Sequence, residues 1–162
     1  MAVLEIRTLP DPVLRQKAKR IKQIDKSVTK LIADMLETMY ASPGRAGLAA
    51  PQVGVSLRVI VIGIPEQEDF ILVNPEIIKR NGERLLDEGC LSVPGYYGQV
   101  SRAETVTAKG RDQNGKEIRI KADGLLAQAL EHEIDHLNGR LYIDHLESME
   151  DLRQVVAEDM ET

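Results

Sequence analysis

The sequence has 162 residues, a formal net charge of −5 and a single cysteine, and this length predicts one domain over residues 1–162. The negative charge argues against a nucleic-acid-binding surface, the lone cysteine excludes an internal disulfide framework, and no apolar run approaches the roughly 20 residues of a membrane span. The N-terminus, MAVLEIRTLPDPVL, lacks the features of a signal peptide or a transit peptide. We therefore expect a cytoplasmic protein, and a processed organellar form would have the same features.

Two helices are predicted in the first 45 residues. Asp11 followed by Pro12 is typical of a helix start and predicts a short helix that runs toward Lys19. After Asp25, apolar residues recur at intervals of three and four, which predicts an amphipathic helix that ends at residues 42–44. Its apolar stripe consists of Val28, Leu31, Ile32, Met35, Leu36 and Met39. The segment RAGLAAPQVGV that follows has little periodicity, so we interpret it as an irregular segment able to line a site.

Strands are predicted in the middle of the chain and two more helices near its end. The β-rich runs cover residues 57–62, 69–73, 77–78, 104–109 and 117–121. The last two runs flank Asn114-Gly115, a strong hairpin signal, so we expect antiparallel pairing. Asp123 begins a helix that Asn138-Gly139 closes with a left-handed cap. A final helix is expected from about Ser148, with Leu152, Val155 and Val156 on one face.

The stretch EHEIDH, residues 131–136, lies inside the helix that begins at Asp123 and contains two of the chain's three histidines. In a helix, His132 and His136 lie one turn apart on the same face, close enough to share one ion. Zinc-dependent hydrolases use H-E-x-x-H in this way, and the intervening glutamate, here Glu133, reaches a water bound to the ion. A solvated helix face is the alternative interpretation, and the helical context makes it the weaker one.

A catalytic metal site needs a third protein ligand, and the residues alone leave two alternatives. Tyr142 stands where the longer H-E-x-x-H-x-x-G-x-x-H pattern has a histidine, which argues against that class of protease. A downstream glutamate such as Glu158 is one alternative. Cys90, in the stretch EGCLS, is the other, because a thiolate is a strong ligand for such metals. A lone cysteine is equally often a small buried apolar residue.

Three segments of the chain together resemble the signature motifs of the peptide deformylase family. They are GLAAPQ at residues 47–52, EGCLS at residues 88–92 and HEIDHLNG at residues 132–139, in the family's order and at similar spacing. The resemblance implies an α+β fold in which antiparallel β-sheets pack around a central helix that carries HExxH. It also implies a hydrolase that removes the N-formyl group from formyl-methionine on new proteins and releases formate. Formyl-Met nascent peptides, and the ribosome near its exit tunnel, are the implied partners.

The resemblance also implies roles for individual residues. The implied metal ligands are Cys90, His132 and His136. The resemblance indicates iron(II), with zinc, nickel or cobalt as substitutes, whereas sulfur and nitrogen ligands in a tetrahedral site favour zinc on chemical grounds. Metal-bound hydroxide would attack the formyl carbon with Glu133 as general base and acid, while the Gln52 side chain and the Leu91 backbone N–H bind the oxyanion. The expected substrate-binding residues are Ala46, Gly47, Leu86, Leu125, Gln128 and Ala129. A supporting ion pair is expected between Glu88 and Arg102.

Three positions depart from the family's pattern. Arg45 replaces a glycine, Glu131 replaces a glutamine and is expected to add negative charge beside the site, and Gln128 replaces an aliphatic residue. We expect the chemistry to survive and the substrate specificity to change. The alternative functions are a small metalloprotease with a glutamate ligand, a non-catalytic peptide-binding or metal-binding module, and a thiol nucleophile at Cys90 with His132 as base.

Overall fold

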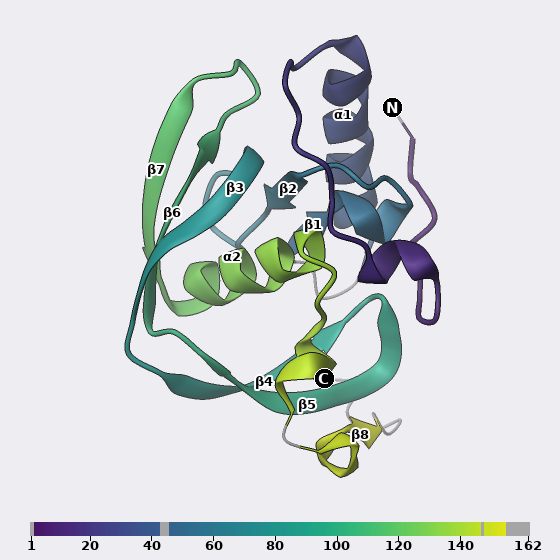
Figure 1. Ribbon diagram of the computed structural model, residues 1–162, viewed down its shortest axis with the longest axis vertical. Coiled ribbons are helices and arrows are strands. Elements are labelled where there is room, and N and C mark those ends of the chain that lie inside the picture. Colours follow the sequence, from purple (N-terminus) through teal and green to yellow (C-terminus); the bar gives the residue numbers. More distant parts are fainter. Residues whose placement is uncertain (1, 43–45, 147, 155–162) are drawn as a thin grey trace.

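Two antiparallel sheets and two α-helices build residues 2–42, 46–146 and 148–154, which the computed structural model describes (Figure 1). The larger sheet consists, in spatial order, of β1 (Gly47–Ala49), β2 (Val59–Ile62), β3 (Phe70–Asn81), β6 (Thr105–Arg111) and β7 (Glu117–Asp123). The smaller sheet consists of β4 (Arg84–Cys90), β5 (Val93–Arg102) and β8 (Arg153–Gln154). Each neighbouring pair of strands is antiparallel, which confirms the expected α+β class.

Strand β2 lies in the core between helix α1 (Lys26–Tyr40) and helix α2 (Gly124–Leu137). All four residues of β2 are buried, and alternate side chains point to opposite faces. Val59 and Val61 pack in the cluster that contains the apolar stripe of α1, whereas Ile60 and Ile62 pack in the cluster that contains the apolar side of α2. Figure 1 shows α2 in the middle of the molecule, between the larger sheet and the strands β4 and β5. The sheet therefore provides a rigid support for the helix that carries the histidine pair.

Helix α1 begins where the sequence predicts. The Asp25 side chain accepts a hydrogen bond from the backbone N–H of Val28 at 3.0 Å, which satisfies one of the free donors of the first turn. The predicted stripe is buried, with Leu36 partly so, and it covers the β1–β2 side of the larger sheet. Burial of this stripe, rather than helix propensity alone, stabilises the helix.

Several elements in the first two-thirds of the chain differ from their predictions. The helix predicted toward Lys19 is only a 3-10 turn, η1 (Pro12–Arg15), because the backbone becomes extended at Gln16. The runs 69–73 and 77–78 form one strand, β3, whose pairing with β6 shifts register twice. The segment interpreted as irregular contains β1 and the 3-10 turn η2 (Ala50–Val53). Strands β4 and β5 were not predicted, because they contain glycine and charged residues and one of their faces is largely exposed.

The helix predicted from about Ser148 is wrong within the described residues. Ser148 caps a single 3-10 turn, η4 (Met149–Asp151), and Leu152 packs against a core cluster. The chain then pairs as β8 with Tyr96 and Tyr97 of β5, so strand hydrogen bonds replace the expected helical ones. Val155 and Val156 lie outside the described residues.

The predicted hairpin between β6 and β7 is confirmed. Gly115 has a φ of 84°, in the left-handed region that favours glycine, and the Asp112 side chain accepts hydrogen bonds from the backbone N–H groups of Asn114 and Lys116.

Among the described residues, no helix has the length and apolarity needed to span a membrane.

The C-terminal end of α2 is fixed by a left-handed cap and by a buried arginine. Gly139 has a φ of 74°, which confirms the predicted cap. The Arg58 side chain is 8% exposed and donates hydrogen bonds to the Leu137 carbonyl at 2.9 Å and to the Asn138 side-chain oxygen at 3.1 Å. A cation at this end also interacts favourably with the helix dipole. Arg58 therefore holds the end of the helix one residue after His136.

We expect Arg58→Leu to lower the free energy of unfolding by about 2 kcal/mol, because charge-assisted hydrogen bonds to the helix end are lost. Chemical denaturation measures this change. Arg119→Leu, at an exposed position on β7, is the matched control and is expected to change stability by less than about 0.5 kcal/mol. Equal stabilities of the two variants would contradict the capping role.

Candidate metal centre and active site

Helix α2 presents the histidine pair on one face, as the spacing predicts. The ring centroids of His132 and His136 lie 5.0 Å apart and the rings meet edge to face. Both side chains point toward the end of β4, where Cys90 lies. The Cys90 sulfur lies 3.3 Å from His136 Nε2, and one donor atom from each of the three residues lies within 4.8 Å of the others. Residues far apart in the sequence thus form one candidate ligand set.

The end of β4 is irregular, and this irregularity directs Cys90 toward the helix. The pairing of β4 with β5 shifts register between Gly89 and Cys90. Such a bulge bends a strand and re-aims a side chain. The Ser92 backbone N–H and the Gln52 side-chain amide both donate to the Cys90 sulfur at 3.5 Å. The thiol is therefore held in place by backbone and side-chain donors.

A buried ion pair orients His132. The Glu88 carboxylate bonds to His132 Nδ1 and accepts two hydrogen bonds from the guanidinium of Arg102, one of them at 3.0 Å from Nε. Glu88 is 6% exposed and Arg102 is 3% exposed, so the expected ion pair is present and buried. Burial raises the pKa of Glu88, but His132 and Arg102 outweigh burial and hold this pKa well below its ordinary value. Glu88 therefore remains an anionic acceptor that leaves Nε2 of His132 available for an ion.

The electrostatics of the cluster fit a cation at its centre. Burial raises the pKa of the Cys90 thiol, but the two imidazoles outweigh burial and lower this pKa well below its ordinary value. Burial lowers the pKa of His132, but Glu133 and the thiol raise it well above its ordinary value. Among the described residues, Glu133 Oε1 and His136 Nδ1 are buried without a hydrogen-bond partner. One thiolate, two imidazoles and an unpaired carboxylate oxygen form a set that suits a divalent ion and its water.

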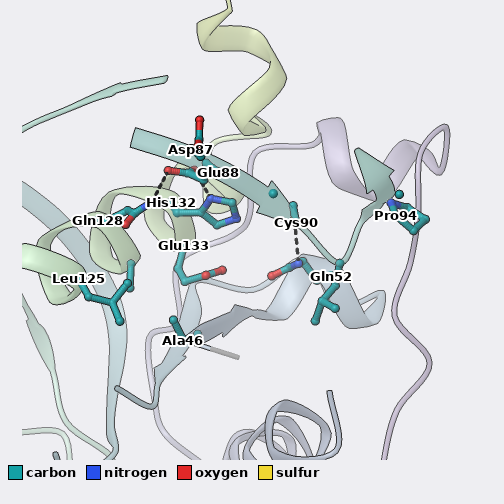
Figure 2. A pocket seen from close by; sticks show the side chains of 15 residues that line it. Ala46, Gln52, Asp87, Glu88, Cys90, Pro94, Leu125, Gln128, His132 and Glu133 are labelled. Carbon is teal, nitrogen blue, oxygen red and sulfur yellow. Dashed lines mark hydrogen bonds and ion pairs between the residues drawn. The ribbon is translucent and has the colours of Figure 1, made fainter. Parts of the chain in front are cut away.

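Two of the candidate ligands, Cys90 and His132, line a cavity of about 520 Å³ together with Glu133 (Figure 2), and His136 is buried behind them. Its lining includes five of the six predicted substrate-binding residues: Ala46, Gly47, Leu125, Gln128 and Ala129. Leu86, the sixth, is not among the lining residues, although its neighbour Asp87 is. Gln52 and Leu91, to which the resemblance gives oxyanion-binding roles, also line the cavity. The sequence assigned no role to Asp87 or Pro94, although their closeness to EGCLS was an available signal.

Two of the three departures from the family's pattern lie in the described residues. Glu131 does not add charge beside the site: its carboxylate accepts hydrogen bonds from the Ala103 backbone N–H at 2.8 Å and from Arg80 Nε at 3.1 Å. Gln128 does line the cavity, and its amide donates to Glu88 at 3.2 Å (Figure 2). Arg45 lies outside the described residues. Of these two residues, only Gln128 changes the polarity of the cavity wall.

We expect Gly47→Ala to reduce turnover by about 10- to 100-fold by displacing Glu133, because small misplacements of reacting groups carry costs of this size. A Cβ atom at Gly47 would lie 2.9 Å from Glu133 Cγ and 3.0 Å from Glu133 Oε2. Steady-state kinetics on a formylated peptide, the substrate that the resemblance implies, measure the loss. Gly89→Ala, where the nearest atom to a Cβ is 3.3 Å away, is the control and is expected to lose less activity. The reverse order would contradict the proposed packing.

A thiol and the two imidazoles of an H-E-x-x-H helix, beside a buried glutamate in an α+β fold, define the class of single-metal hydrolases. The family model described as polypeptide deformylase matches residues 3–152. The chain belongs to the polypeptide deformylase family.

Relatives and solved structures agree over nearly the whole chain. The peptide deformylase of Dehalococcoides mccartyi is 58% identical over 160 residues, which cover 98% of this chain and 95% of that protein. The peptide deformylase of Halothermothrix orenii is 57% identical and covers 89% of this chain and 94% of that protein. The crystal structure of a peptide deformylase from Legionella pneumophila superposes with a TM-score of 0.88 at 49% identity and covers 93% of this chain and 89% of that chain. The crystal structure of a peptide deformylase from Synechococcus elongatus, in complex with actinonin, has a TM-score of 0.87 at 45% identity. The match covers 93% of this chain and 82% of that chain.

Proposed function

We propose that this protein is a peptide deformylase that hydrolyses the N-formyl group of formyl-methionine at the start of newly made polypeptides. Water adds to the formamide, formate leaves and the N-terminal amine is freed. The observation that carries the proposal is the convergence of Cys90, His132 and His136 at the wall of a cavity that Glu133 also lines. Sequence identity of 58% to a named peptide deformylase over nearly the full chain supports the same reaction. We place the reaction in the bacterial cytoplasm, on nascent chains near the ribosomal exit tunnel.

The proposed ion is iron(II), with zinc, nickel and cobalt as substitutes that the same donors accept. Cys90, His132 and His136 would hold a divalent ion, which would supply a lowered pKa of water and a polarised formyl oxygen. The two histidine rings are held in different ways. Glu88 orients His132, whereas His136 is fully buried and its Nε2 lies beside the Cys90 sulfur. Three ligands from the protein would be the number that a catalytic site of this kind uses.

Glu133 is the proposed general base and acid. Its carboxylate is buried at the cavity wall, with one oxygen unpaired within the described residues. Burial raises the pKa of Glu133 above its ordinary value, although the neighbouring imidazoles oppose this effect. A raised pKa suits a group that must accept a proton from water and then return it to the departing amine. The burial of Glu133 and the direction of its pKa shift support this role in both proton transfers.

Gln52 and the Leu91 backbone N–H are the proposed donors to the developing oxyanion. Gln52 is buried, and its side-chain oxygen accepts from the Ala49 backbone N–H at 3.0 Å. This contact turns the amide nitrogen toward the Cys90 sulfur, at 3.5 Å (Figure 2). The amide is thus held in position before substrate arrives, which makes such donors effective.

We expect Gln52→Glu to reduce the turnover number by about 100-fold or more, because the acceptor for Ala49 is kept and the donor to the oxyanion is lost. Steady-state kinetics on a formyl-Met peptide measure this change. Ser92→Ala, which removes only the hydroxyl that Gln52 contacts at 3.3 Å, is the control and is expected to lose less than about tenfold. Unchanged turnover in Gln52→Glu would contradict the role.

The cavity beside the candidate ligands is the proposed site for the methionine side chain. Ala46, Leu125 and Ala129 give it an apolar wall, and Gln128 adds an amide. Strand β1 is at an edge of the larger sheet, so the backbone at Gly47 has a free side for an extended peptide within the described residues. These features support a substrate that enters as a strand with its first side chain buried.

Formate release by the iron(II)-loaded protein, purified without oxygen, tests the proposed function. We expect rapid formate release from a formyl-Met-Ala peptide and no acetate release from the matched acetyl-Met-Ala peptide. Metal analysis of the same sample must show iron. A metal-loaded, folded protein that releases no formate would overturn the proposal.

A further inference from the structure

His145, the third histidine of the protein, lies at the outer end of a series of charged groups in contact. This series leads to the candidate ligand His132. His145 belongs to the 3-10 turn η3 (Tyr142–His145), and its side chain is 32% exposed. Its Nε2 lies 2.8 Å from Asp135 Oδ2. The same Asp135 oxygen accepts a hydrogen bond from Arg102 Nη1 at 2.8 Å. One carboxylate oxygen therefore joins a surface histidine to a buried arginine.

The inner half of this chain of contacts leaves Arg102 with little freedom. Nε and Nη2 of its guanidinium bond to Glu88 and Nη1 bonds to Asp135, so the plane of the group is fixed between two carboxylates. Glu88 in turn contacts His132 Nδ1. A shift of Asp135 would therefore move Arg102, then Glu88 and finally the imidazole ring of His132.

We propose that His145 is a positioning residue for the metal centre, because its bond to Asp135 holds the Arg102–Glu88 pair that orients His132. Its removal leaves Asp135 with Arg102 as its one remaining side-chain partner among the described residues. Asp135 is then freer to turn toward water. The inference rests on the metal site of the proposed function but not on the reaction.

Zinc affinity, measured by competition with a chromophoric chelator, tests this inference on the full chain. Substitution of a group that contacts a metal ligand directly typically weakens metal binding by about 10- to 100-fold. His145 acts through three intervening residues, Asp135, Arg102 and Glu88, so a smaller effect is expected. We therefore expect His145→Ala to weaken zinc binding by about 3- to 10-fold and to shift the visible absorption of the cobalt(II) form. His145→Gln, whose amide can donate to Asp135, is expected to stay within about twofold of the wild type.

Arg15→Ala is the matched control. Arg15 pairs with Asp144 of the same turn and donates to the Gly139 carbonyl at 3.5 Å. Within the described residues it has no contact with the charged groups that lead to His132, so its loss leaves them in place. We expect wild-type zinc affinity and a wild-type cobalt spectrum for this variant. If His145→Ala does not fold, His145→Leu serves as the second variant without a donor.

Two results would overturn the inference: equal zinc affinities for His145→Ala and Arg15→Ala, or a folded His145→Gln that binds zinc as weakly as His145→Ala. A wild-type protein that binds no zinc would overturn both the inference and the metal site. A wild-type protein that binds zinc, responds as expected to these substitutions and releases no formate in its iron form would overturn the proposed function alone.

Discussion

Glu133→Ala is expected to slow formate release by about 10²- to 10⁴-fold while metal binding remains, because proton transfer is lost and the ligands are kept. Glu133 is buried at the cavity wall next to both candidate histidine ligands, and one of its oxygens has no hydrogen-bond partner in the described part of the chain. The kinetic constants of the iron(II) form, together with the metal content of the same sample, measure the effect.

Asp87→Asn is the control for Glu133→Ala, because it removes a different carboxylate from the lining of the same cavity. Asp87 is exposed and has no proposed role in proton transfer. We therefore expect Asp87→Asn to change turnover by less than about tenfold. Full activity in Glu133→Ala would rule out the general-base role. If neither the wild type nor Glu133→Ala turned over substrate while both held metal, the chain would be a non-catalytic binding module.

Cys90→Ala is expected to abolish stable metal binding and, with it, formate release. The Cys90 sulfur is the one ligand that comes from outside α2, and without it two imidazoles remain to hold the ion. Elemental analysis after dialysis is expected to give close to one ion per chain for the wild type and a small fraction of that for Cys90→Ala. Circular dichroism shows whether the variant is folded.

The same experiment separates the alternative functions. Retention of metal in Cys90→Ala would indicate a glutamate as the third ligand, as in a small metalloprotease. Glu158, the glutamate considered for this role, lies outside the described residues. An enzyme that used Cys90 as a thiol nucleophile would lose its activity in Cys90→Ala. Its wild-type form would stay active after a chelator has removed the metal. Loss of both metal and activity agrees with the ligand role of Cys90.

Local sequence patterns predicted the elements that bury one regular face. The three-and-four spacing after Asp25 and the Asn114-Gly115 turn each correspond to an observed element, because both signals depend on neighbouring residues alone. Strands β4 and β5 escaped prediction because their sequences contain glycine, and because charged residues such as Glu88 and Arg102 occupy buried positions, so that apolar and polar residues do not alternate with burial. The C-terminal pattern was misleading, since pairing with β5 competes with helix formation at Arg153–Gln154.

The candidate site needed more than local patterns. The helical spacing of His132 and His136 predicted their common face, but no periodicity places Cys90 beside them. That contact depends on where the end of β4 lies relative to α2. The residues alone left Cys90 and a glutamate as alternatives, and the resemblance to a family favoured Cys90. The roles of Asp135 and His145 were not predicted, because their contacts depend on where η3 lies relative to α2.

X-ray absorption at the metal edge of the zinc-loaded wild-type protein tests the shared ligand set most directly. We expect one sulfur neighbour at about 2.3 Å and two imidazole nitrogens at about 2.0 Å, together with one further light atom. A first shell that contains only nitrogen and oxygen would contradict the site described above.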